Sequence, residues 1–144
     1  MKDIVTVEID APQERVAELF ADPRNAPAWM TDLKSYQPLL GEPGMPGSTY
    51  RLLQQGGKLA FVVTVVERDL PNEVLLSLDS PKVAVSVRAK FIAFDGRTKL
   101  VSIEKFRFKG LFGPIFGLLA KRSIRKAHSG QMQSFKRYVE KGRQ

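Results

Sequence analysis

The sequence predicts an α+β fold in which a curved, seven-stranded antiparallel sheet, two short helices and a long C-terminal helix enclose a hydrophobic cavity. Three observations predict it. Segments that alternate apolar and polar residues recur along the chain, as in half-buried strands. Gly-Gly, Pro-Asn and Asp-Gly pairs separate several of them, which is typical of hairpin turns. After residue 110 the apolar period lengthens to three or four residues, which favours a helix.

Length and composition favour one compact unit. The 144 residues are 43% hydrophobic, enough for one core, and we expect residues 1–144 to form a single domain. The chain has no cysteine, which excludes disulfides and thiolate chemistry. Its opening, MKDIVTVEID, carries acidic residues where a secretory signal needs an unbroken apolar run. We therefore expect a cytoplasmic protein.

The N-terminal elements follow from short patterns. Val5, Val7 and Ile9 alternate with polar residues, which predicts a strand. Pro12 suits a first helical turn, and residues 13–20 (QERVAELF) have helical spacing. A second short helix is expected over residues 26–30, which include the only tryptophan, Trp29.

The middle of the chain predicts an antiparallel meander of six further strands. Turn-forming residues, including the loop GEPGMPG at 41–47, separate the alternating segments. The predicted strands span residues 34–40, 48–55, 58–69, 73–79, 83–94 and 97–108.

The last helix is expected from residue 111 onward, with Pro114 tolerable only near its start. Small residues lie on or near the side predicted to face the sheet, namely Ala120, Ser123, Ala127, Gly130 and Ser134. They permit either a helix packed close to the sheet or a helix that stands off and leaves a void. We expect the void, because the glycines of the predicted turns favour strong sheet curvature.

Strand alternation predicts which side chains line this cavity. In the segment 83–94, Val83, Val85, Val87, Ala89 and Phe91 share the inner face. In the last strand the inner face includes Ser102, Glu104 and Phe106. The predicted ligand-binding residues are Trp29, Tyr50, Phe61, Val85, Val87, Phe91, Ser102, Phe106, Phe116, Ala120 and Ala127.

Glu104 is the candidate catalytic residue. A carboxyl among apolar neighbours has a raised pKa and can act as an acid or base. The alternative is that Glu104 pairs with a cation such as Arg88, should the turn at Asp95-Gly96 shift the register. His128, the only histidine, lies among basic residues and is expected to be solvated. One histidine and dispersed carboxylates predict no metal site, and we expect no cofactor.

Positive charge is concentrated at the C-terminal end. The net charge is +8, yet residues 105–144 hold eleven Lys and Arg against a single acid, Glu140. A solvated basic face is one interpretation. Another is contact with an anionic membrane, aided by the neighbouring Leu111, Phe112, Ile115 and Phe116. The apolar run 111–120 is too short to span a bilayer, which takes roughly 20 residues. Nucleic-acid binding is not expected, because the basic residues lack interleaved aromatics.

Apolar residues on the outer sheet face raise the hypothesis of a homodimer, since apolar residues facing solvent need cover. They are Val62, Val66, Val101 and Ile103.

The segment VEIDAPQERVAELFADPRNAPAWM resembles the opening of the START-like, or SRPBCC (Bet v 1-like), superfamily. Pro43-Gly44, Asp95-Gly96 and a closing Phe135 and Tyr138-Val139 extend the resemblance over nearly the whole chain. It implies the helix-grip fold, in which the sheet grips a long C-terminal helix around a hydrophobic pocket. Similar members are described as polyketide cyclase/dehydrase-like. The superfamily also contains lipid-transfer, ubiquinone-chaperone, plant-hormone and co-chaperone proteins, so the fold does not choose a function.

Two functions are therefore carried forward. The first is a carrier or sensor that binds a hydrophobic small molecule or lipid. Its entrance is expected between the loop around Gly44 to Gly47 and the start of the last helix, which Gly110, Gly113 and Gly117 would loosen. The second is a cyclase or dehydratase acting on a polyketide-like substrate. Its candidate polar groups are Ser102, Glu104, Tyr36, Tyr50 and His128.

Overall fold

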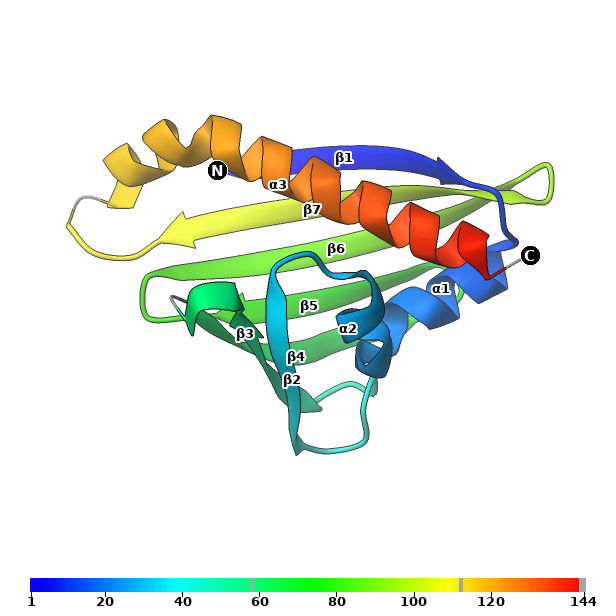
Figure 1. The fold of residues 1–144 in the computed structure, drawn as a ribbon, viewed down its shortest axis with the longest axis horizontal. Coiled ribbons are helices and arrows are strands. Elements are labelled where there is room, and N and C mark those ends of the chain that lie inside the picture. Colours follow the sequence, from blue (N-terminus) through cyan, green and yellow to red (C-terminus); the bar gives the residue numbers. More distant parts are fainter. Residues whose placement is uncertain (58, 112, 143–144) are drawn as a thin grey trace.

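The computed structural model describes residues 1–57, 59–111 and 113–142. Lys58, where one strand was predicted to begin, and Phe112 of the predicted membrane contact lie outside the described residues. Along the chain the elements are β1 (Lys2–Ile9), α1 (Gln13–Ala21), η1 (Pro23–Asn25), α2 (Ala26–Trp29), β2 (Leu33–Leu40), β3 (Thr49–Gln54), η2 (Gln55–Gly57), β4 (Ala60–Asp69), β5 (Glu73–Asp79), β6 (Val83–Phe94), β7 (Arg97–Phe108) and α3 (Gly113–Lys141), as Figure 1 shows.

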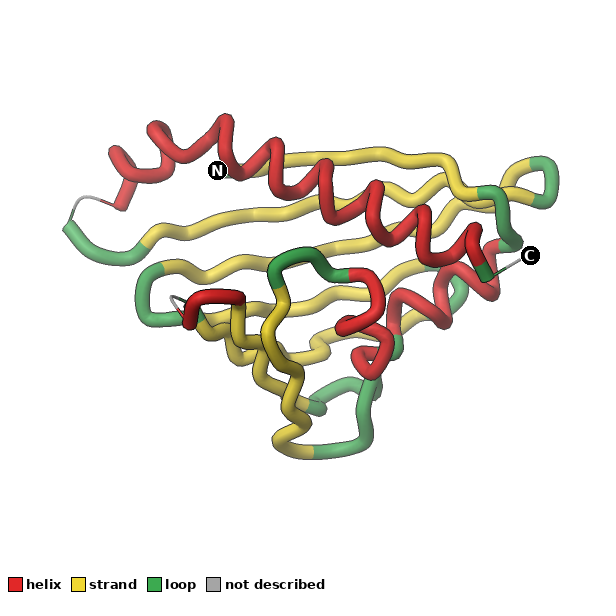
Figure 2. The backbone as a smooth tube through the Cα atoms, in the orientation of Figure 1, coloured by secondary structure: helices red, strands yellow, loops and turns green. Residues whose placement is uncertain are grey.

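The strands form one seven-stranded antiparallel sheet in the order β1-β7-β6-β5-β4-β3-β2. The N-terminal strand therefore pairs with the last strand, and the other six form a meander. Figure 2 shows the sheet bending, with all the helices on its concave side. The predicted α+β architecture is confirmed.

Turn chemistry sets the strand boundaries. Asp95 and Gly96 both have positive φ, 48° and 74°, as a two-residue hairpin between twisted strands requires. The turn fixes the register of β6 on β7, with Val87 opposite Glu104 and Val85 opposite Phe106. The predicted bounds of β5, β6 and β7 are confirmed.

The core lies where the C-terminal half of α3 packs against α1 and the sheet. Phe135 and Val139 are fully buried, and Met132 is nearly so. The ring of Phe135 makes edge contacts with Phe20 at 5.2 Å and Trp29 at 4.9 Å between centroids. These aromatic contacts fix the helix at its C-terminal end.

The buried stripe of α3 differs from the predicted one. Ser123, Ala127 and Gly130 are exposed. The buried residues of α3 are Gly113, Gly117, His128, Met132, Phe135 and Val139. The large side chains of the C-terminal half set the rotation of the helix, because their burial contributes more than that of small residues.

β2 lies at one edge of the sheet and is largely exposed. Pro38 within it has no backbone N–H to donate. The pairing of β2 with β3 also shifts register between Leu33 and Ser35 and between Pro38 and Leu40. The sheet therefore ends in an irregular strand.

Candidate functional site

Three adjoining chambers lie between α3 and the concave face of the sheet. The inner chamber has a volume of about 90 Å³, the middle chamber about 200 Å³ and the outer chamber about 560 Å³. Inner and middle chambers share Met30, Leu52 and Glu104 in their walls, and middle and outer chambers share Phe61 and Phe106. The shared wall residues place the three chambers in a row from the core to the start of α3, and this row of adjoining chambers is called the passage below.

Most of the predicted ligand-binding residues line this passage. Trp29, Tyr50, Val87 and Ser102 line the inner chamber. Phe61, Val85 and Phe106 line both the middle and the outer chambers, Ala127 lines the middle one, and Phe116 and Ala120 line the outer one. Phe91 instead packs in the core, with its ring 5.7 Å from that of Phe20. Ligand contact by these residues stays a prediction.

Phe108, at the end of β7, supports the start of α3. A Cβ added at Gly113 would overlap the Phe108 carbonyl oxygen, and one at Gly117 would lie 2.8 Å from the Phe108 ring. The two glycines therefore permit close packing, where we had expected them to loosen the helix. Helix and sheet meet at this support, and hollows lie on both sides of it.

The outer chamber opens at a different place from the predicted entrance. Lys82, Lys109 and Leu111 line it, and Leu59 adds the turn between β3 and β4. The loop at 41–47 lies at the other end of the sheet (Figure 1). There, a Cβ at Gly44 would lie 3.1 Å from the Ala21 carbonyl oxygen. The predicted entrance beside that loop is wrong, because the loop packs against α1.

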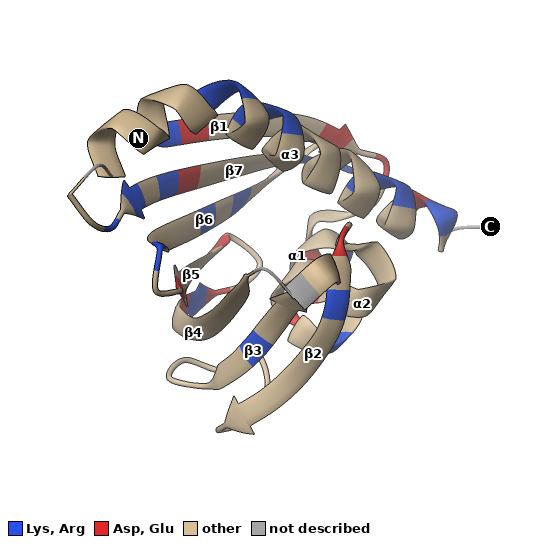
Figure 3. Ribbon diagram, turned by 60° about the vertical axis from the view of Figure 1, so that its left-hand side comes forward, with Lys and Arg blue, Asp and Glu red and all other residues tan. Residues whose placement is uncertain are grey.

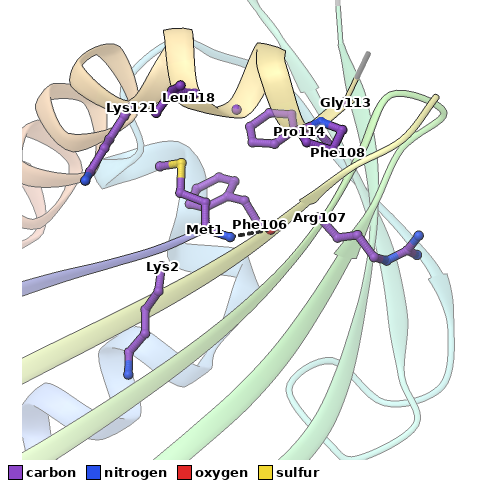
Figure 4. Close-up of a pocket in the computed structure, with 10 residues that line it drawn as sticks. Met1, Lys2, Phe106, Arg107, Phe108, Gly113, Pro114, Leu118 and Lys121 are labelled. Atoms are coloured by element: carbon purple, nitrogen blue, oxygen red, sulfur yellow. Dashed lines mark hydrogen bonds between the residues drawn. The ribbon is translucent and has the colours of Figure 1, made fainter. Parts of the chain in front are cut away.

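A second hollow, of about 520 Å³, lies on the other side of the first turns of α3 (Figure 4). Met1, Phe106, Leu118 and Lys121 contribute to its walls. The amino group of Met1 donates a hydrogen bond to the Phe106 carbonyl oxygen at 3.2 Å. The walls of this hollow add Met1, Phe106 and Leu118 to the apolar surface around the start of α3.

A buried polar chain joins β1, α3 and β7. His128 Nδ1 lies 2.8 Å from Asp3 Oδ2, and His128 Nε2 lies 2.8 Å from Ser102 Oγ. Because a carboxylate only accepts, Nδ1–H donates to Asp3 and the neutral ring accepts from the Ser102 hydroxyl. Burial lowers the pKa of His128, although Asp3 opposes the change. The prediction of a solvated histidine is wrong, since His128 is 2% exposed.

Asp3 was not among the predicted site residues, although its position in the sequence indicates burial. Asp3 precedes Val5, Val7 and Ile9 in the same alternation, which places it on the inner face. His128 follows Ile124 by four residues, which places it on the inner stripe of the helix. A buried histidine needs a partner, and Asp3 supplies one.

Glu104 lies beside this chain and lines the inner and middle chambers. Its Oε1 is 3.5 Å from His128 Nδ1, and its side chain is 22% exposed. Burial, and after it the negative charge of Asp3, raises the pKa of Glu104 to about 7. The alternative pairing with Arg88 is wrong. Arg88 lies on the outer face and pairs with Glu73 at 2.8 Å and Glu67 at 3.5 Å.

The polar cluster fits proton exchange better than acyl transfer. Ser102, His128 and Asp3 follow the hydrogen-bond order of a hydrolytic triad. Ser102, however, lies inside β7, which is paired with β1 and with β6 at this position. The backbone N–H groups of β7 around Ser102 are therefore engaged in the sheet and do not form an oxyanion hole. Glu104, whose pKa of about 7 allows both the protonated and the ionised form near neutral pH, lines the inner and middle chambers.

The first turns of α3 expose large apolar side chains. Leu111, Ile115, Phe116, Leu118 and Leu119 are 59 to 90% exposed. Figure 3 shows basic residues along α3 and at the end of β7. Within the described residues, no helix is long and apolar enough to cross a membrane. Nor do those residues include a group of three or more His, Asp or Glu arranged to hold a metal ion.

Comparisons with known proteins agree with this architecture. Residues 4–140 match the family model for polyketide cyclase / dehydrase and lipid transport. A comparison with curated proteins finds no match. The structure of TTHA0849 from Thermus thermophilus is similar, with a TM-score of 0.81 at 16% identity over 96% of this chain and 97% of that one.

Two further solved structures establish the same fold. Ara h 8.0201 has a TM-score of 0.74 at 16% identity, over 96% of this chain and 97% of that one. The Zhui aromatase/cyclase from a Streptomyces species has a TM-score of 0.72 at 16% identity, over 95% and 94%. The predicted helix-grip fold and the resemblance to the SRPBCC superfamily are confirmed.

Proposed function

The chain belongs to the polyketide cyclase / dehydrase and lipid transport family, and from that membership we propose that it binds a hydrophobic small molecule or lipid in the three chambers, as a carrier or sensor. One observation carries the proposal: an apolar passage leads from the core to an opening beneath the first turns of α3. Each 100 Å² of apolar ligand surface buried there contributes roughly 2.5 kcal/mol, before the costs of association.

Titration with the neutral apolar dye N-phenyl-1-naphthylamine tests this function. We expect saturable binding with one dye per chain and displacement by lipids extracted from cells. Ala120→Trp places a bulky ring in the outer chamber and should weaken dye binding at least tenfold. Ser123→Trp, on an exposed position of the same helix, is the matched control. Dye uptake that never saturates, or equal binding by both variants, would refute the proposal.

We propose that such a ligand enters the outer chamber while the protein is bound to an anionic membrane. Two of the exposed apolar residues at the helix start, Leu111 and Phe116, line the outer chamber, and Leu118 lines the hollow on the other side of the helix. Lys82 also lines the outer chamber, and Lys2, Arg107 and Lys121 line that hollow. Apolar side chains that enter the lipid interface and cations that face its headgroups are the two signals that peripheral binding requires.

Vesicle cosedimentation tests the membrane contact. Binding should need phosphatidylglycerol in phosphatidylcholine vesicles and weaken with added salt, because salt screens surface charge. Leu118→Gln with Leu119→Gln should abolish it. The same changes at Leu39 and Leu40, which are also exposed but lie on β2, should have no effect. Equal binding to neutral vesicles would refute the contact.

A homodimer through the outer sheet face stays a separate proposal. Val62 and Val66 on β4 are 39% and 45% exposed, and Ile92 on β6, which β5 separates from β4, is 46% exposed. Light scattering over a hundredfold concentration range tests it. A mass that stays at one chain would end the proposal, and the Leu118 and Leu119 variant should leave the mass of any dimer unchanged.

A cyclase-type reaction is the second candidate, because Glu104 lines the chambers and its pKa is raised to about 7. Its carboxylate would take a proton from a carbon between two carbonyls of a poly-β-keto chain. The enolate would attack another carbonyl of the same chain, and Glu104 would return the proton to the new alkoxide. Glu104→Gln should abolish turnover of such a chain and leave dye binding intact. Unchanged turnover would exclude the role.

A further inference from the structure

The inner chamber contains polar groups that the surrounding protein leaves unsatisfied. The indole N–H of Trp29 is buried and has no hydrogen-bond partner among the described residues, and Trp29 is one of the residues that line this chamber. Tyr36 also has an unpartnered hydroxyl, but it is not among the described residues that line the chamber. An unpaired buried donor costs about 1 to 3 kcal/mol. Such a group calls for a partner beyond the protein's own side chains.

Packing prevents Trp29 from turning to find a partner. Its ring stacks on Phe20 at 5.7 Å and meets the edge of Phe135 at 4.9 Å between centroids. Its carbonyl oxygen also accepts a hydrogen bond from the Ser134 hydroxyl. The indole is therefore held from α1 and α3 at once, and its position at the chamber wall is fixed.

Glu104, on β7, is a second residue of the inner chamber whose polar group has no hydrogen-bond partner among the described side chains. Its Oε1 is 3.5 Å from Nδ1 of His128, whose N–H is already donated to Asp3. Arg125 is 3.4 Å from Asp3 Oδ1 and so compensates Asp3. Among the described residues, no side chain donates a hydrogen bond to the Glu104 carboxyl. A donor from Trp29 and a carboxyl from Glu104 thus line one small chamber.

We propose that the inner chamber binds the neutral oxygen group, a hydroxyl or a carbonyl, of an otherwise apolar ligand, held by the Trp29 N–H and the Glu104 carboxyl. This inference rests on the proposed binding function and specifies which end of the ligand enters first. The chamber volume of about 90 Å³ exceeds the roughly 30 Å³ that a water occupies in the liquid, so a polar end with adjoining carbons fits. A carboxylate head is disfavoured, because the small chamber would bury its negative charge with no cation among the described lining residues.

Three ligands of nearly equal shape test the subsite on the unmodified protein. They are 2-naphthol, 2-methylnaphthalene and 2-naphthoate, each displacing N-phenyl-1-naphthylamine at about pH 6, below the Glu104 pKa of about 7. We expect 2-naphthol to bind about tenfold more tightly than 2-methylnaphthalene, the effect of one or two net hydrogen bonds. The naphthoate should bind more weakly than either.

Variants assign the preference to the two residues. Glu104→Leu should reduce the advantage of 2-naphthol over 2-methylnaphthalene to less than about twofold, since Leu keeps the volume and removes the polar group. Trp29→Phe should reduce it about threefold. Glu18→Leu, which replaces an exposed glutamate on α1, is the matched control and should retain the full preference.

The possible results distinguish failure of the polar subsite from failure of the proposed binding function. Saturable binding of both neutral ligands with equal affinity would overturn the polar subsite and leave the apolar passage intact. A preference that persists in Glu104→Leu would equally overturn it. If neither ligand nor the dye binds saturably, both the subsite and the binding function are refuted.

Discussion

In the C-terminal half of α3, Met132, Phe135 and Val139 are at most 4% exposed, whereas Ile115, Leu118 and Leu119 near its start are 60 to 78% exposed. One continuous helix therefore has two environments. The C-terminal half is part of the core. The first turns pack on Phe108, with a hollow on each side. The contrast shows that stability and ligand access are assigned to different turns of the same helix.

The largest effect should follow from breaking the core half. Phe135→Ala removes a fully buried ring that contacts Phe20 and Trp29. Deleting such a ring costs about 3 to 5 kcal/mol of the free energy of unfolding. Urea denaturation followed by circular dichroism measures it. A loss below about 1 kcal/mol would mean that this half is not the anchor.

The second largest effect should be the pH dependence of the free energy of unfolding. It tests the boundary between the two halves of α3, where His128 lies. The pKa of Glu104 is raised from 4.5 to about 7 in the folded protein, so the folded state keeps the proton more tightly. The contribution of Glu104 to the free energy of unfolding is at its maximum below pH 4.5 and is lost as the pH rises to about 7. The change is up to about 3 kcal/mol.

Glu104→Gln isolates this effect. His128 acts in the opposite direction, because its lowered pKa reduces stability as the pH falls below its ordinary value of 6.5. Asp3 on β1 and Arg125 on α3 are the other charged groups at this position. In the variant, urea denaturation at several pH values should show only the decline on the acid side. A variant with the wild-type profile would contradict the role of Glu104.

Two glycine-to-alanine substitutions on α3 should differ in their effect on the free energy of unfolding, by less than the changes above. A Cβ at Gly130 has nothing within 4 Å, whereas one at Gly117 would lie 2.8 Å from the Phe108 ring. Gly130→Ala should stabilise the protein by about 1 kcal/mol through helix propensity. Gly117→Ala should lack this gain and weaken dye binding, because Phe108 must move. Equal stabilisation by both would show that the support at Phe108 is loose.

The smallest effect should come from the exposed half. Leu118→Gln with Leu119→Gln should change the free energy of unfolding by less than about 0.5 kcal/mol, as is usual for surface positions. Val139→Ala, the control in the buried half, should cost at least about 1 kcal/mol. A large loss in the leucine variant would show that these residues are covered in solution.

Much of the fold was predictable because strand alternation and turn chemistry are local signals. The alternation of Ser102, Glu104 and Phe106 along the last strand was enough to place Glu104 on the inner face, whereas the register at Asp95-Gly96 could be read only from the structure. The rotation of α3 was not predictable from its small residues, because the large side chains near its C-terminal end determine it. His128 and Asp3 pair across 125 positions of sequence, and the packing of α3 against β1 brings them together.

The edge strand β2 has a consequence for self-association. Fibril growth proceeds by adding strands to an exposed sheet edge whose backbone groups are unpaired. Pro38 withholds one N–H from that edge, and the register shift after it interrupts the regular spacing. A further strand would find no continuous ladder there, so this edge is a poor template for amyloid-like stacking even in concentrated solution.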